Sequence, residues 1–121
     1  MRYFLTGATG FIGGHLARQL RSAGHDVVAL VRAPGAARDL AALGVELAPG
    51  DILAPDTLRD PMEGADGVFH LAAWYRLGAR DRQRARAINV DGTRNVLQAA
   101  ADADVPRVVY TSTLAVFGDT G

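Results

Sequence analysis

Three glycines near the start of the chain have the spacing that a phosphate-binding turn requires. Gly7, Gly10 and Gly13 lie in Thr6-Gly-Ala-Thr-Gly-Phe-Ile-Gly-Gly14, between a short apolar run and an amphipathic stretch. Gly7 permits a tight turn, Gly10 lets a pyrophosphate approach the backbone, and Gly13 lets a helix pack closely on the strand. The start of that helix offers free amides and positive potential to phosphates. The pattern predicts a dinucleotide site, and the alternative is a merely tight turn.

The end of the second apolar run bears on the choice of dinucleotide. An acidic residue about twenty positions after the glycines would bind the 2′-hydroxyl of NAD. Here the run ends in Leu30-Val-Arg32, without a carboxylate. Arg32 offers a planar, permanently charged donor for the 2′-phosphate of NADP. We therefore expect NADP as the cofactor, with NAD as the second choice; the alternative for Arg32 is a solvated side chain at a strand end.

Alternating strands and helices must position these residues. Short apolar runs alternate with longer amphipathic stretches, which is typical of β-α-β units that build a parallel sheet. We expect strands at 3–6, 27–31, 45–47, 67–71 and 107–111 and helices at 36–43, from 55 and at about 82–102. The first helix should bury Ile12, Leu16, Leu20 and Ala23 and stop at Gly24. The predicted fold class is α/β, a doubly wound parallel sheet with strand order 3-2-1-4-5, and residues 1–121 form one domain.

Composition narrows the ligand class. Thirteen basic residues balance thirteen acidic ones, so no net field favours nucleic acid or an anionic membrane, and a small molecule is the expected partner. The absence of Cys excludes disulfides, thiolate metal sites and Cys nucleophiles. No signal peptide and no membrane-spanning apolar run is visible. We expect a cytoplasmic protein without a metal site.

The turn sequence Thr-Gly-Ala-Thr-Gly-Phe-Ile-Gly resembles the signature of the extended short-chain dehydrogenase/reductases, the NAD-dependent epimerase/dehydratase family. Further segments match that family in order: Asp51-Ile52, His70-Leu-Ala-Ala73, Ile88-Asn-Val-Asp-Gly-Thr93 and Val109-Tyr-Thr-Ser-Thr113. The resemblance spans the chain but corresponds to the family's N-terminal half. It implies a Rossmann fold and part of an NAD(P)-dependent oxidoreductase, epimerase or dehydratase. The substrate would carry its hydroxyl or carbonyl on a nucleotide sugar or another small metabolite.

The resemblance also implies roles at the pyrophosphate and adenine. Phe11 and Ile12 would line the pyrophosphate turn. Asp51 would hydrogen-bond the adenine, with Ile52 against its face. The alternative for Asp51 is a carboxylate that only closes a local turn or caps a helix.

Other implied roles lie nearer the nicotinamide. Leu71, Ala72 and Ala73 would pass beneath the dinucleotide, or would simply pack at a strand end. Asn89 would lie near the active site, or would bond its own helix or solvent. His70 is interpreted as a buried imidazole with satisfied hydrogen bonds rather than a metal ligand or a base, because no second ligand has suitable spacing nearby.

The last motif would supply the substrate contacts. Thr111 and Ser112 would approach the nicotinamide side mainly through their backbone. Thr113 corresponds to the family's catalytic hydroxyl, which hydrogen-bonds the substrate oxygen. The alternative for Thr113 is a β-branched strand residue.

One departure from the family governs catalysis. Family chemistry relies on a Tyr and a Lys four residues later, which lowers the pKa of the phenol for proton transfer. The chain contains no Lys, and the residues four past Tyr3, Tyr75 and Tyr110 are Gly7, Ala79 and Leu114. We therefore expect an incomplete unit, truncated after the fifth strand, which is inactive alone and prone to self-association through that strand. The alternatives are a non-catalytic dinucleotide-binding sensor or regulatory module and an inert fragment.

Overall fold

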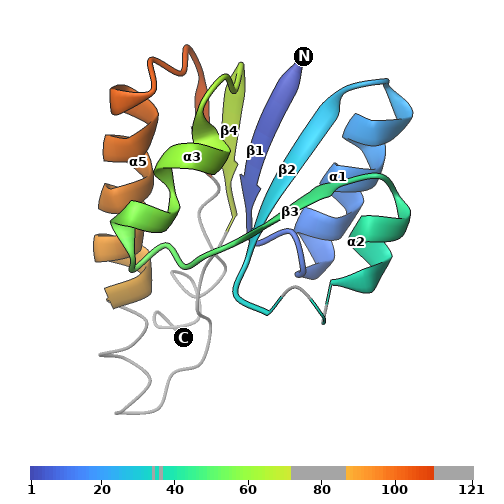
Figure 1. Ribbon diagram of the computed structural model, residues 1–121, viewed down its shortest axis with the longest axis horizontal. Helices are drawn as coiled ribbons and strands as arrows, with labels where there is room; N and C mark the ends of the chain where they lie inside the picture. Colours follow the sequence, from blue (N-terminus) through green and yellow to red (C-terminus); the bar gives the residue numbers. More distant parts are fainter. Residues whose placement is uncertain (34, 36, 72–86, 111–121) are drawn as a thin grey trace, which may run out of the picture.

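The computed structural model describes residues 1–33, 35, 37–71 and 87–110, which form a five-stranded parallel sheet with helices on both faces (Figure 1). The strands are β1 (Arg2–Thr6), β2 (Asp26–Val31), β3 (Glu46–Pro49), β4 (Gly67–His70) and β5 (Val108–Tyr110). They lie in the order β3-β2-β1-β4-β5, and every neighbouring pair is parallel. The predicted fold class and strand order are confirmed.

The helices form one layer on each face of the sheet. Figure 1 shows α1 (Phe11–Ser22) and α2 (Arg38–Ala42) on one side, with α3 (Arg59–Met62) and α5 (Thr93–Asp102) on the other. The 3-10 turn η2 (Pro55–Thr57) precedes α3, and the π-helical segment η3 (Ala87–Gly92) leads directly into α5. The expected helix from residue 55 is therefore a short 3-10 turn followed by one α-helical turn.

The core consists of two clusters separated by the sheet. Phe4, Val28 and Leu30 pack toward α3 and α5, whereas Leu5, Val27 and Ala29 pack toward α1 and α2. Successive side chains of a strand point to opposite faces, so a strand covered on both sides must be apolar throughout. This explains why residues 27–31 are all buried.

Each helix-to-strand connection contains a residue with left-handed backbone conformation. Gly24 and Gly44 follow α1 and α2 with φ of 85° and 86°, and Gly64 follows α3 with φ of 78°. Asp104 takes the same place after α5, with φ of 55°. Glycine adopts this conformation without a Cβ penalty. The predicted helix stops at Gly24 and Gly44 are confirmed.

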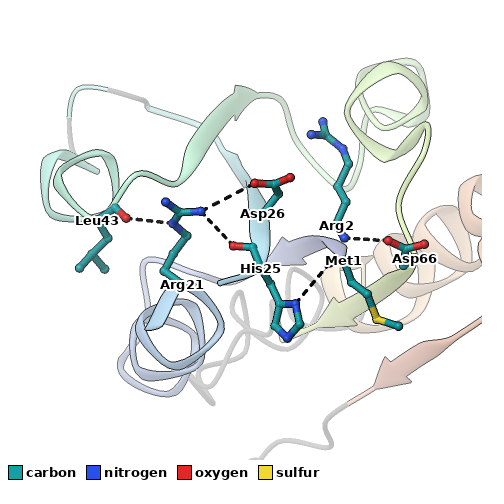
Figure 2. A network of polar contacts seen from close by, with 7 residues as sticks. All are labelled: Met1, Arg2, Arg21, His25, Asp26, Leu43 and Asp66. Carbon is teal, nitrogen blue, oxygen red and sulfur yellow. Dashed lines mark hydrogen bonds and ion pairs between the residues drawn. The ribbon is translucent and has the colours of Figure 1, made fainter. Parts of the chain in front are cut away.

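Charged side chains hold these connections together at the amino ends of the strands (Figure 2). The Arg21 guanidinium donates from Nε to the Leu43 carbonyl at 3.0 Å and from Nη1 to the His25 carbonyl at 2.9 Å, so it ties α1 to the residues after α2 and before β2. The Arg2 amide donates to Asp66 Oδ2 at 2.7 Å. At the amino ends of the strands, these polar groups therefore find their hydrogen-bond partners within the protein.

Two sequence expectations need correction. Ile12 and Ala23 were expected on the buried stripe of the first helix, but Ile12 is 59% exposed and Ala23 is exposed. Leu16 and Leu20 pack against the core as expected, and Gly13 and Ala17 are buried beside them, because Gly13 packs against the turn after β1. In the expected helix at 82–102, Gly92, Val96 and Ala99 are buried as predicted, while Ala85 lies outside the described residues.

No helix among the described residues combines the length and the apolar content that crossing a membrane requires.

Candidate functional site

The glycine turn lies at the carboxyl end of β1 and leads directly into α1. Gly7 follows the strand with φ of 73°, and the amide of Gly10 donates to the Gly7 carbonyl at 3.1 Å. Gly10 is the N-cap of α1, and its carbonyl accepts the first helical bond from Gly14 at 2.8 Å. The chain thus reverses within three residues and begins the helix at Phe11.

Gly13 allows the first turn of α1 to lie against this loop. A Cβ at Gly13 would collide with the Gly7 carbonyl oxygen and lie 2.7 Å from the Ala8 Cα. A Cβ at Gly10 would lie 3.3 Å from the Gly7 oxygen, which is tight but needs only a small adjustment. The close approach predicted for Gly13 is present, and its partner is the backbone of residues 7–8 rather than the strand itself.

The first turn of α1 leaves backbone donors available. The amides of the first three helical residues, Phe11, Ile12 and Gly13, have no acceptor within the helix. No acidic residue stands in this turn, and the Gly10 N-cap provides no side-chain hydrogen bond. The turn therefore presents three amides and the positive end of a 12-residue helix.

Arg32 and Asp51 follow the neighbouring strands β2 and β3. Arg32 is exposed and, within the described part of the chain, makes no ion pair. Asp51 is half-buried, and its Oδ1 accepts from the Leu53 amide at 3.0 Å, which is the local turn that sequence analysis left open. The Thr57 hydroxyl bonds both the amide and the carbonyl of Asp51, each at 3.1 Å.

Ile52 is mostly enclosed by the protein. Its side chain is 7% exposed and belongs to the core cluster on the α5 side of the sheet. A Cβ on Gly92 would come within 2.5 Å of Ile52 Cδ1, so the end of η3 lies directly against this side chain.

His70, at the end of β4, is the centre of a buried polar chain. It is 1% exposed, its Nδ1 lies 2.7 Å from Thr6 Oγ1, and its Nε2 lies 2.8 Å from Thr93 Oγ1. The Leu71 amide donates to the same Thr6 oxygen at 3.1 Å. Desolvation lowers the pKa of His70 to about 4, so the imidazole is neutral at pH 7. The prediction of a buried imidazole with satisfied hydrogen bonds is confirmed.

A neutral imidazole suits this position. One ring nitrogen donates and the other accepts, while each threonine hydroxyl can do either, so both ring nitrogens are paired in either tautomer. The Tyr110 ring stacks on the imidazole with 5.5 Å between ring centroids. His70 therefore joins the ends of β1, β4 and β5 to α5.

Helix α5 makes a second polar contact that sequence reasoning missed. Asn95 Nδ2 donates to the Ile52 carbonyl at 2.8 Å. Thr93 and Asn95 are polar residues that flank the buried stripe of the helix, and the sequence gives no indication of their distant partners. The structure thus adds Thr6, Thr93 and Asn95 to the residues around the site.

The described site residues lie at one edge of the sheet. Gly7, Arg32, Asp51 and Leu71 follow the carboxyl ends of β1, β2, β3 and β4 in turn, which is where open α/β sheets bind ligands. Asn89 lies in η3. Ala72, Ala73, Thr111, Ser112 and the predicted catalytic Thr113 lie outside the described residues. In the described part of the chain, no group of three or more His, Cys, Asp or Glu side chains could hold a metal ion.

Comparisons with known proteins agree with this arrangement. The chain is 43% identical over 119 residues to a 4-hydroxy-2-methyl-3-oxo-4-farnesyl-3,4-dihydroquinoline-1-oxide ketoreductase of Stigmatella aurantiaca, a match that covers 98% of the chain and 35% of that protein. A short-chain dehydrogenase/reductase superfamily protein from Agrobacterium tumefaciens, crystallised with bound NAD, is 32% identical with a TM-score of 0.81, over 94% of this chain and 33% of that one.

A nucleoside-diphosphate-sugar epimerase from Pseudomonas aeruginosa is 32% identical with a TM-score of 0.72, over 91% of this chain and 32% of that one. The chain thus spans about a third of the length of these relatives. The model of the NAD dependent epimerase/dehydratase family matches residues 3–121. With this match over nearly the whole chain, and with the glycine turn at the carboxyl edge of a 3-2-1-4-5 sheet, the chain belongs to the NAD dependent epimerase/dehydratase family.

Proposed function

We propose that the chain binds NADP(H) along the carboxyl edge of its sheet, as the cofactor-binding part of an NAD(P)-dependent oxidoreductase, epimerase or dehydratase. The observation that carries this proposal is the turn between β1 and α1, where three helix amides lack internal acceptors and no carboxylate competes for them. Pyrophosphate oxygens would complete these bonds. When bound, the nicotinamide supplies hydride chemistry.

The neighbouring residues fit the rest of a dinucleotide. Asp51 already uses Oδ1 for its local turn, so adenine recognition in this proposal falls to Oδ2 and to the backbone of residues 51–52. Ile52 would present only an edge of its side chain, because the core encloses most of it. Leu71, whose amide is fixed by Thr6, would pass beneath the dinucleotide.

The preference for NADP rests on Arg32. Its exposed guanidinium stands just past β2 without an ion-pair partner in the described residues, and no carboxylate there would repel a 2′-phosphate. We expect Arg32→Ala to weaken NADP(H) binding by about 1.5–3 kcal/mol while NAD(H) binding stays unchanged. Calorimetric titration with both cofactors checks this, and equal affinities in the parent protein would contradict the preference.

Substrate chemistry belongs to the whole protein. We propose a hydroxyl or carbonyl of a nucleotide sugar or another small metabolite as the reacting group, with Thr113 bonding its oxygen. The chain contains no Lys, so a Tyr-Lys pair for proton transfer would have to come from residues outside these 121. These residues alone should therefore bind cofactor without turnover. Assays of NADPH oxidation with carbonyl substrates check this, and turnover at enzymatic rates would contradict it.

Binding itself is best tested at the glycine turn. We expect Gly10→Ala to leave the fold intact, because its methyl group lies 3.3 Å from the Gly7 oxygen, but to lower dinucleotide affinity at least tenfold by standing where the pyrophosphate approaches. The matched control is Gly14→Ala, whose methyl group would make an ordinary 3.6 Å contact with the Ala8 carbonyl. Calorimetry with circular dichroism separates binding from folding. Normal binding by Gly10→Ala, or loss only through unfolding, would refute the proposal.

A further inference from the structure

The start of α5 contacts two segments that the proposed function places along the cofactor. Thr93 Oγ1 lies 2.8 Å from His70 Nε2, at the end of β4, and Asn95 Nδ2 donates to the Ile52 carbonyl, past β3, at 2.8 Å. Residues two positions apart on an α-helix are rotated by about 200° about the helix axis. Thr93 and Asn95 therefore lie on opposite flanks of the stripe centred on the buried Val96, and they reach in different directions.

The contact of Thr93 extends to the pyrophosphate turn. From His70 the chain of hydrogen bonds continues through Nδ1 to Thr6 Oγ1 at 2.7 Å, and this oxygen also accepts from the Leu71 amide at 3.1 Å. Thr6 directly precedes Gly7. Thr6 and His70 are buried and Thr93 is half-buried, so water does not readily replace a bond lost between Thr6 and His70. A change at Thr93 therefore affects both the turn after β1 and the segment after β4.

The contact of Asn95 fixes the adenine side. It holds the Ile52 carbonyl from the helix, while Gly92, one residue before α5, lies against the Ile52 side chain. Asp51 and Thr57 shape the same loop from within. The loop is thus bonded internally, but the hydrogen bond from Asn95 ties its main chain to the helix across 43 residues of sequence.

We propose that Thr93 and Asn95 are positioning residues that hold segments 70–71 and 51–52 at the separation the dinucleotide requires. This inference rests on the proposed function. A ligand that spans several strand ends gains full affinity only if those ends are held in place beforehand, because otherwise binding must also order them. In this proposal helix α5 acts through the protein segments that Thr93 and Asn95 contact.

The test uses near-isosteric variants of the protein and two probes, adenosine 2′-phosphate for the adenine side without a pyrophosphate and NADPH for the whole cofactor. Asn95→Leu removes the donor and should weaken both probes about 5–10-fold. Thr93→Val removes the hydroxyl and should weaken NADPH binding by a similar factor, while binding of adenosine 2′-phosphate is less affected. Thr93→Ser restores the hydroxyl and should restore the affinity. The matched control is Gln98→Leu on the same helix, whose exposed amide bonds only Asp102 among the described residues and should bind as the parent does.

A role confined to folding predicts a different result. The variants would then melt at lower temperature but bind both probes with parental affinity while folded, and this outcome would overturn the inference. If Asn95→Leu or Thr93→Val fails to fold, Asn95→Asp and Thr93→Ala are measured in its place under the same criterion. If the parent binds neither probe, the proposed function fails and this inference with it. If the parent protein binds both probes and the variants bind them equally well, the inference is overturned while the proposed function stands.

Discussion

The two ends of the sheet use their polar groups in opposite ways. At the amino ends of the strands, Arg21 bonds two carbonyls from different connections and Asp66 accepts from the Arg2 amide. At the carboxyl ends, the side-chain bonds between elements are neutral, from Thr93 through His70 to Thr6 and from Asn95 to Ile52. There the charged Arg32 and three helix amides keep their donors free of partners in the described residues.

This difference shows which end stabilises the fold and which is prepared for a ligand. Each group that is satisfied internally at the amino end contributes to stability in the free protein. A neutral framework at the carboxyl end holds the backbone in place and leaves the strongest donors for an anion. Substitutions at the amino end should therefore change stability alone, while those at the carboxyl end should change binding, unless they strike the backbone framework itself.

The largest expected effect is at Gly13, which packs against residues 7–8 and also supplies one of the helix amides proposed to bind the pyrophosphate. Gly13→Ala would drive a methyl group into the backbone of residues 7–8, which cannot move aside as a flexible side chain would. We expect the free energy of unfolding to fall by about 3 kcal/mol, in contrast with the mild effect of Gly10→Ala. Urea unfolding of both variants measures this. Equal stability of the two variants would contradict the assigned packing.

Acid should lower the free energy of unfolding, because it protonates His70 at the carboxyl ends of the strands. In the folded protein the pKa of His70 is about 4, below the ordinary 6.5. Below pH 6.5 the unfolded chain therefore binds a proton that the folded chain does not bind. The stabilisation is complete above pH 6.5 and is lost as pH falls toward 4. From pH 7 to 5 this amounts to about 2 kcal/mol. Unfolding of the parent and of His70→Gln at both pH values measures the difference. An NMR titration in which the His70 ring protonates near pH 6.5 would contradict it.

The smallest expected effect is at the amino end and has the opposite sign. Asp104 adopts φ of 55° where the three other connections have glycine, and a non-glycine residue there costs about 1 kcal/mol. Asp104→Gly should therefore raise the free energy of unfolding by about 0.5–1 kcal/mol, because relief of strain exceeds the entropy lost from the unfolded chain. Thermal melting and cofactor titration are the measurements. A change in cofactor affinity would break the separation between the two ends.

Much of this fold was predictable because its signals are local. The continuous apolar run at 27–31 indicated a strand covered on both faces, and glycines marked the turn after β1 and two of the helix ends. Asp104 gave no such signal, because an aspartate in a sequence does not by itself indicate a left-handed backbone conformation. The exposed Ile12 was misplaced because periodicity does not reveal how closely Gly13 approaches the loop.

The site was only partly predictable. The position of Gly7, Arg32 and Asp51 at one edge was predictable because parallel strands bring their carboxyl ends together. His70 was predicted to be buried and satisfied, but Thr6 is 64 residues away and Thr93 is 23 residues away. Such pairs depend on strand register and on the rotation of α5 about its axis, which spacing along the chain does not fix. The contact of Asn95 with Ile52 was not predicted for the same reason.

The central place of β1 has a consequence for how the protein opens. Strands β2 and β4 pair with it on both sides, and Phe4 and Leu5 are fully buried. We expect amides in such a strand to exchange with solvent hydrogen only when the whole domain unfolds, and those of edge strands such as β3 to exchange through smaller openings. Because Gly7 follows β1 directly, the turn proposed to hold the pyrophosphate is attached to the last part of the molecule to open. Fluctuations that release β3 should therefore leave this turn intact.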